Sequence, residues 1–156
     1  MSVGVWITGS ILALGGILGA SWYTQGKEKQ IECLAKNLYF EVGNQGTAGM
    51  LAVSSVVINR INDDRFPNTM CKVIHQKRGG VCQFSWYCDG KSDEPKDETG
   101  WLKAKDYARI VYHNWLFFDV TEGATHYHAT YVKPAWARTK TRTTRIESHI
   151  FYRWEK

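Results

Sequence analysis

Residues 33–46 read CLAKNLYFEVGNQG, an apolar stretch that closes on two glycines. The apolar residues around its start recur at helical spacing, which predicts a first helix over 31–41. Glu41 stands at the end of this helix between aromatic and aliphatic side chains. Because an apolar setting penalises the charged form of a carboxyl group, we expect a raised pKa, as a general acid for glycosidic cleavage requires. The alternative is an ordinary surface glutamate at a helix end.

The rest of the chain alternates helical patterns with short extended segments. After a short linker at 26–30, the sequence predicts helices over 48–61, 70–76 and 100–118, a small β excursion over 81–88, and strands over 124–129 and 149–154. With 156 residues the chain is long enough for one domain with a core, and it contains no internal repeat. We therefore expect one mainly helical α+β domain, residues 27–156.

Composition and charge narrow the class of protein and of partner. Hydrophobic residues make up 44% and aromatic residues 13% of the chain, which excludes a disordered protein. The net charge is +5, and the segment 131–156 alone carries seven basic and two acidic residues. A basic segment suits an anionic partner, and no nucleic-acid-binding motif is visible, so we expect no nucleic-acid partner.

Four cysteines allow three pairings. No Cys-x-x-Cys pair is present and the spacings fit none of the usual zinc frameworks. We favour two disulfides, Cys33–Cys71 and Cys82–Cys88. This pairing implies an oxidising, non-cytosolic destination and no metal site. A zinc site is the alternative, since His126 and His128 could supply nitrogen ligands.

The first 26 residues contain no charged side chain, and residues 3–23 are long enough to span a bilayer. We therefore expect residues 1–26 to form a transmembrane or signal-anchor segment; a cleaved signal peptide and a buried helix are the alternatives. Lys27 and Lys29 favour a cytoplasmic catalytic body, whereas the disulfides favour the opposite side. We favour a membrane-anchored or exported protein with its body on the cell-wall side, in the periplasm or cell envelope.

Five ordered blocks of the body resemble the cell-wall hydrolase family typified by the spore cortex-lytic enzyme SleB. The blocks are 33–46, 49–60, Phe66-Pro67 with Cys71 and Val73, 82–90, and the pair 123–128 and 149–153. Together they cover roughly residues 31–154. One departure is Val42-Gly43-Asn44, where relatives often carry an arginine.

The resemblance implies a lysozyme-like catalytic domain that cuts peptidoglycan between N-acetylmuramic acid and N-acetylglucosamine, as a lytic transglycosylase with one catalytic glutamate. On this chain that residue is Glu41. No other carboxylate lies between Glu41 and Asn62, which favours a route in which Glu41 acts first as acid and then as base. A hydrolytic muramidase or glucosaminidase and a non-catalytic, membrane-tethered wall-binding module are the alternatives. We expect a monomer that binds peptidoglycan and needs no cofactor.

Seven further residues are expected to bind substrate: Gln83, Ser85, Trp86, Thr125, His126, Tyr127 and His128. The first two offer hydrogen-bonding groups, while Trp86 and Tyr127 offer flat faces to sugar rings. Along a strand, Thr125 and Tyr127 face one way and the two histidines the other, so we expect only one set to line the cleft. A structural role is the alternative for the histidines. Asn59 and Arg60 are interpreted as capping and packing residues.

Overall fold

The structure is a computed structural model that describes residues 13–114 and 119–156. Its helices are α1 (Ala13–Val42), α2 (Thr47–Ile61), α3 (Met70–Ile74) and α4 (Glu98–Asn114). α2 is confirmed within one residue, and the last four residues of the helix expected over 100–118 lie outside the described residues. The linker expected at 26–30 is wrong, because α1 runs through it without a break. Gly26 costs a helix about 1 kcal/mol, but the four residues after it are good helix formers.

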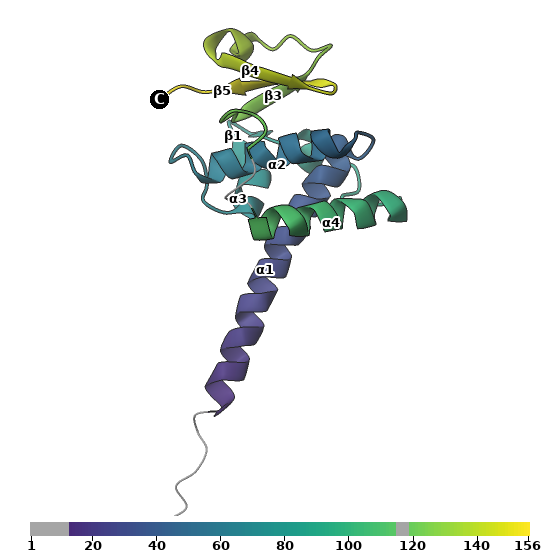
Figure 1. The fold of residues 1–156 in the computed structure, drawn as a ribbon, viewed down its shortest axis with the longest axis vertical. Coiled ribbons are helices and arrows are strands. Elements are labelled where there is room, and N and C mark those ends of the chain that lie inside the picture. Colours follow the sequence, from purple (N-terminus) through teal and green to yellow (C-terminus); the bar gives the residue numbers. More distant parts are fainter. Residues whose placement is uncertain (1–12, 115–118) are drawn as a thin grey trace, which may run out of the picture.

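The helical core forms where the C-terminal half of α1 packs against the other three helices. Leu34 and Leu38 of α1 are fully buried with Met50, Val53 and Val57 of α2. Each such side chain contributes about 1.5–3 kcal/mol by leaving water. The N-terminal half of α1 extends away from this body in Figure 1. The core therefore holds the end of α1, and with it Glu41, in a fixed place.

The expected membrane segment is only partly covered by the structure. Its first twelve residues lie outside the described residues, and the remainder belongs to α1. Within the described ranges, no helix combines the length and the apolar character that a bilayer crossing requires. The N-terminal span therefore stays a prediction.

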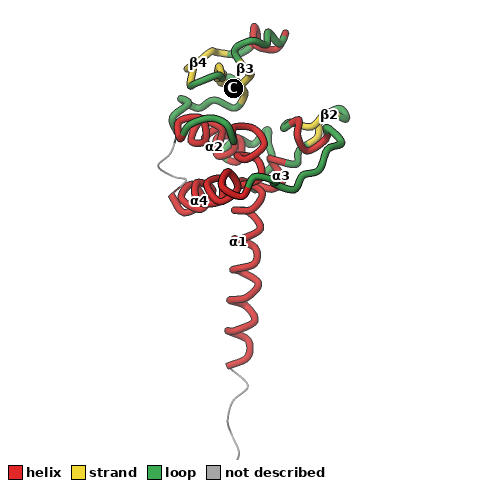
Figure 2. The backbone as a smooth tube through the Cα atoms, turned by 90° about the vertical axis from the view of Figure 1, so that its right-hand side faces the viewer, coloured by secondary structure: helices red, strands yellow, loops and turns green. Residues whose placement is uncertain are grey.

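The β excursion expected over 81–88 is a small hairpin followed by a helical turn. β1 (Lys77–Arg78) pairs antiparallel with β2 (Val81–Cys82), and a 3₁₀ helix, η1 (Ser85–Cys88), follows. Gly79 and Gly80 join the two strands with positive φ angles of 58° and 80°, which glycine adopts without a steric penalty. The hairpin lies beside the helical body in Figure 2.

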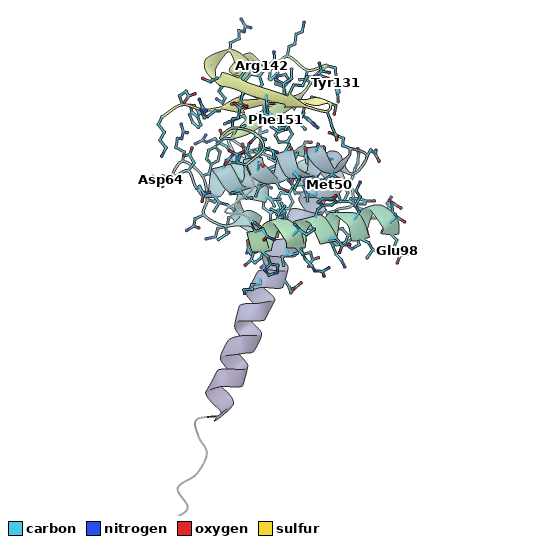
Figure 3. The ribbon with its side chains drawn as sticks, in the orientation of Figure 1. Met50, Asp64, Glu98, Tyr131, Arg142 and Phe151 are labelled. Carbon is cyan, nitrogen blue, oxygen red and sulfur yellow. A yellow bond between two sulfur atoms is a disulfide. The ribbon has the colours of Figure 1, made fainter. Side chains whose placement is uncertain are left out.

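The second sheet has three strands in the order β3-β5-β4 and follows α4 in the chain. β3 (His126–Ala129) and β5 (His149–Arg153) match the expected strands, whereas β4 (Thr141–Ile146) was not expected. A 3₁₀ helix, η3 (Ala135–Thr139), precedes β4. Phe151 of β5 is fully buried against Ala52 and Val56 of α2, and Figure 3 shows it between the sheet and that helix. This small cluster places β3 across from the end of α1.

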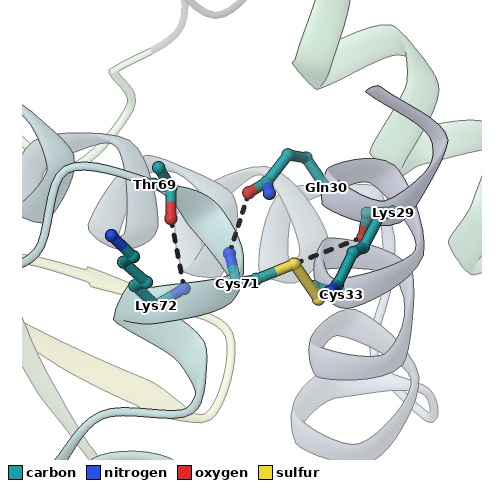
Figure 4. The surroundings of a disulfide bond; sticks show 6 residues. All are labelled: Lys29, Gln30, Cys33, Thr69, Cys71 and Lys72. Carbon is teal, nitrogen blue, oxygen red and sulfur yellow. Dashed lines mark hydrogen bonds between the residues drawn. A yellow bond between two sulfur atoms is a disulfide. The ribbon is translucent and has the colours of Figure 1, made fainter. Parts of the chain in front are cut away.

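Both expected disulfides are present, Cys33–Cys71 and Cys82–Cys88. The first ties α1 to α3, and beside it the side chain of Gln30 accepts a 3.0 Å hydrogen bond from the backbone N–H of Cys71 (Figure 4). The second closes the segment that carries Gln83, Ser85 and Trp86. Since all four thiols are oxidised, the zinc alternative loses its cysteine ligands.

Candidate active site

One cleft of about 1010 Å³ lies between the end of α1, the β1–β2 segment and strand β3. It brings together Glu41 and six of the seven expected binding residues: Gln83, Ser85, Trp86, His126, Tyr127 and His128. Thr125 is the exception. It is buried behind the cleft, where its hydroxyl forms a 2.9 Å hydrogen bond with Nδ1 of His126. Segments distant in sequence thus meet around Glu41.

Glu41 lies in the last turn of α1 and is half-buried. Burial raises its pKa above the ordinary value of 4.5, while a hydrogen bond from Tyr127 and the charge of Arg60 act in the opposite direction. The negative end of the helix dipole also disfavours a carboxylate here. The site therefore favours a carboxyl that holds its proton to higher pH than an exposed glutamate.

Tyr127 is the direct partner of this carboxyl. Its hydroxyl donates a 2.8 Å hydrogen bond to Oε2 of Glu41. Burial, and then the neighbouring charge of Glu41, raise the pKa of Tyr127 well above 10, so the phenol remains a donor. The ring is held by an edge contact with His149, at 5.1 Å between centroids, and a tilted contact with Phe151 at 5.6 Å. Tyr127 thus fixes one oxygen of Glu41 and leaves the other for substrate.

Arg60 was interpreted as a packing residue, and the structure adds a place in the cleft wall. The side chain is only 4% exposed, and its guanidinium carbon lies 5.3 Å and 5.2 Å from the ring centroids of Phe66 and Phe84. Nε donates a 2.7 Å hydrogen bond to the carbonyl of Thr125, while Nη1 is buried without a hydrogen-bond partner among the described residues. Burial lowers the pKa of Arg60 only to about 10, so it remains a cation at neutral pH.

The signal that could have identified Arg60 is its position. It is the single cation of α2 and lies near the end of that helix, most of whose residues are buried and uncharged. Arginine is rarely fully buried unless its charge is used or paired. Asn59, in contrast, keeps a packing role: its amide donates a 3.0 Å hydrogen bond to the carbonyl of Ala124.

The expectation that only one face of the strand lines the cleft is wrong. His126, Tyr127, His128 and Ala129 all do so, because β3 is an edge strand that pairs only with β5 in the described sheet and presents its free edge to the cleft. His128 also has a structural role: Nε2 lies 3.0 Å from the hydroxyl of Tyr152, and the two rings stack.

The opposite wall is built on Trp86. This side chain is buried, stacks on Phe40 at 5.0 Å and donates a 3.0 Å hydrogen bond to the carbonyl oxygen of the Asn37 side chain. Trp86 therefore supports this wall and presents little free face to a sugar. Gln83 and Ser85 lie beside it and are more accessible to a ligand.

Three other carboxylates line the cleft, at Asp89, Asp93 and Glu94. Asp89 and Glu94 are paired with lysines, at 3.7 Å and 3.1 Å. Among the residues described, Glu41 accepts its side-chain hydrogen bond from Tyr127 and forms none with a second carboxyl group. Within the described ranges, no group of three or more His, Cys, Asp and Glu side chains is placed to hold a metal ion.

The chain is similar in sequence to known proteins. The family model described as Cell Wall Hydrolase matches residues 44–152, so Glu41 lies just before the matched range. The chain is 28% identical over 125 residues to the spore cortex-lytic enzyme of Bacillus cereus, covering 80% of this chain and 44% of that protein. For the Bacillus subtilis enzyme the identity is also 28%, over 78% and 36%. The chain thus spans less than half the length of these relatives.

Two solved structures have a similar fold. The catalytic domain of the germination-specific lytic transglycosylase SleB from Bacillus anthracis superposes with a TM-score of 0.63 at 28% identity, over 80% of this chain and 93% of that domain. The catalytic domain of Bacillus cereus SleB gives the same TM-score at 27% identity, over 81% and 91%. The family model covers well over half of the chain, and both structures are aligned over most of its body. The chain therefore belongs to the Cell Wall Hydrolase family.

Proposed function

We propose that this protein cleaves the glycan strands of peptidoglycan between N-acetylmuramic acid and N-acetylglucosamine, as a lytic transglycosylase with Glu41 as its sole acid/base. The observation that carries the proposal is the state of Glu41: a half-buried carboxyl with a raised pKa, held by Tyr127 in a large cleft. The relatives support it, since one is a lytic transglycosylase by name and others are spore cortex-lytic enzymes.

In the first step, protonated Glu41 donates its proton to the glycosidic oxygen. The bond between that oxygen and C1 of the muramoyl ring breaks, and the N-acetylglucosamine side leaves as an alcohol. The N-acetyl group of the substrate can stabilise the cation left at C1. Glu41, now ionised, then removes the proton of the C6 hydroxyl of the muramoyl ring. The oxygen on C6 bonds to C1 at the same time, which closes a 1,6-anhydro ring. One carboxyl thus serves twice.

A hydrolytic mechanism would need a second carboxylate, as a base or as a nucleophile. An inverting hydrolase needs a carboxylate about 6.5–9.5 Å from the acid, and a retaining one needs it at about 5–5.5 Å. Of the three other carboxylates of the cleft, Asp89 and Glu94 favour neither role, because they are exposed and paired with lysines. Asp93 is half-buried and is the one left to serve a hydrolytic mechanism. A peptidoglycan substrate also agrees with a body on the cell-wall side of a membrane, anchored or exported, where the two disulfides would persist.

The test is digestion of purified sacculi by the 156-residue chain, followed by mass spectrometry of the released muropeptides. The proposal predicts 1,6-anhydro products that disappear with Glu41→Gln, a loss of at least about 10²-fold by the usual contribution of a general acid. Reducing ends in place of anhydro ends would replace transglycosylation with hydrolysis. A folded protein that binds sacculi and releases nothing would favour the wall-binding module.

A further inference from the structure

Four cationic side chains converge on one end of the cleft, around His126: Arg60, Arg65, Arg78 and Lys140. Their convergence is visible at Trp154, whose ring centroid lies 4.2 Å from the guanidinium carbon of Arg65, 5.9 Å from that of Arg78 and 4.7 Å from Nζ of Lys140. His126 lies 5.8 Å from the same ring. Burial, followed by repulsion from these four cations, lowers the pKa of His126 to about 3.

Among the described residues, only one of the four charges is neutralised by a carboxylate. Arg65 forms a bidentate pair with Asp63, with its shortest distance at 2.6 Å. Two further carboxyl groups lie near these cations: Glu155 is paired with Arg153 at 3.0 Å, and Glu41, when ionised, attracts Arg60 from beyond salt-bridge distance. For Arg60, Arg78 and Lys140, the described ranges contain no carboxylate within salt-bridge distance. We call these three residues the cation cluster.

The cation cluster belongs to the same cleft as Glu41. Arg60 and Arg78 line that cleft, and Lys140 lies 5.8 Å from the ring centroid of Trp136, which lines it too. Arg60 also has a buried Nη1 that no described residue bonds. Arg60 is attracted to Glu41 when that carboxyl is ionised, whereas Arg78 and Lys140 have no carboxylate within salt-bridge distance in the described ranges. Holding like charges together with so few counter-ions costs free energy, so a ligand anion would be bound here.

We propose that the cation cluster binds a carboxylate of the peptide stem on the muramoyl residue that occupies the cleft. This inference rests on the proposed function. The sugar rings of a peptidoglycan strand are uncharged, whereas the peptide stems attached to the lactyl groups carry free carboxylates. Arginine and lysine bind such groups by charge-assisted hydrogen bonds. The cleft would then recognise stem-bearing strands and orient them at Glu41.

The test measures binding apart from turnover, by sedimentation of the full chain carrying Glu41→Gln with intact sacculi. Native sacculi are compared with sacculi whose carboxyl groups have been converted to neutral amides. A third preparation carries native carboxyls but has lost its phosphate-linked polymers by hydrofluoric acid treatment. Arg78→Gln and Lys140→Gln are added singly, with Lys103→Gln as the matched control, because Lys103 is an exposed cation on α4 outside the cleft.

We expect native and acid-treated sacculi to bind about tenfold or more tightly than amidated sacculi. Arg78→Gln and Lys140→Gln should each weaken binding to native sacculi about tenfold and leave binding to amidated sacculi unchanged, while Lys103→Gln changes neither. Equal binding to native and amidated sacculi, or an equal loss with Lys103→Gln, would overturn the inference. So would loss of tight binding after acid treatment, which would identify phosphate as the anion. If the binding pattern holds while the unmodified chain releases no muropeptides, only the proposed function fails.

Discussion

Glu41 and Tyr127 lie 86 residues apart in the chain and meet in a 2.8 Å hydrogen bond in the wall of the cleft. The bond joins the last turn of α1 to an edge strand of the three-stranded sheet. It favours the ionised form of Glu41, whereas burial favours the protonated form, and burial is the larger effect. The balance between these two effects determines the pH range in which Glu41 can act as an acid.

Tyr127→Phe should shift that range. Without the phenol donor the pKa of Glu41 rises further, so the alkaline limb of the pH–rate profile moves to higher pH. Activity on the plateau should fall about tenfold, because the carboxyl is no longer held in one orientation. Tyr107→Phe is the matched control, since it removes a 2.7 Å hydroxyl contact with Thr47 outside the cleft. An alkaline limb that moves to lower pH would contradict the role assigned to Tyr127.

Glu41→Gln should abolish activity and change the pH dependence of stability. A folded-state pKa above the unfolded value of 4.5 means that the native state binds this proton more tightly. The stabilising effect is complete below the unfolded pKa and is lost as the pH rises through the folded-state pKa. The loss amounts to about 1.4 kcal/mol for each pH unit that separates the two pKa values. In urea unfolding, the free energy of unfolding of the variant should therefore increase relative to that of the wild type as the pH is raised from below 4.5 to neutrality. A difference in unfolding free energy that does not change with pH would show that the pKa is not raised.

The two disulfides should differ in what their removal costs. Cys33–Cys71 closes a loop of 38 residues and Cys82–Cys88 one of 6. By loop-closure entropy, replacing the first pair with serine should cost about 4 kcal/mol of unfolding free energy and the second about 2 kcal/mol. Removal of the second pair should nevertheless reduce activity more for each kcal/mol of stability lost, because its loop carries Gln83 and Ser85. Equal costs by urea unfolding would show that loop closure is not the dominant effect.

Glu147 should contribute to the stability of the fold by capping the start of α2. Its Oε2 accepts a 3.1 Å hydrogen bond from the backbone N–H of Gly46, the N-cap of that helix. Glu147→Ala should cost about 1 kcal/mol of unfolding free energy, because it removes a helix-terminal acceptor and a favourable charge. Glu122→Ala is the control, since Glu122 also has a positive φ, 58° against 50°, and its carboxylate accepts no hydrogen bond among the described residues. The same loss in both variants would attribute the effect to the backbone conformation.

The sequence was sufficient for the helical framework. The buried residues of α1 recur at helical spacing, and α2 is a long apolar run that is buried along most of its length. The sequence was misleading at Gly26, because one poor helix former suggested a linker where α1 continues without a break. β4 was not predicted because its Thr- and Arg-rich segment has no apolar alternation, and it is defined by pairing with β5. Local sequence cannot supply that partner.

For the site, Glu41 and Tyr127 could be predicted from their own segments and from the family resemblance. The cation cluster could not, because its members come from α2, β1 and the residue before β4. Only the folded sheet brings Lys140 beside Trp154. The sequence also did not predict that His126 and Tyr127 both line the cleft, since this depends on the free edge of β3.

Burial in the cleft is expected to raise the pKa of Glu41 above that of an exposed glutamate, and the most direct measurement is the NMR titration of its side-chain carboxyl carbon in the folded chain. The signal can be assigned as the one that is lost in Glu41→Gln. The structure predicts a titration midpoint above the ordinary value of 4.5, because burial outweighs the hydrogen bond from Tyr127 and the charge of Arg60. A midpoint at or below 4.5 would contradict the account.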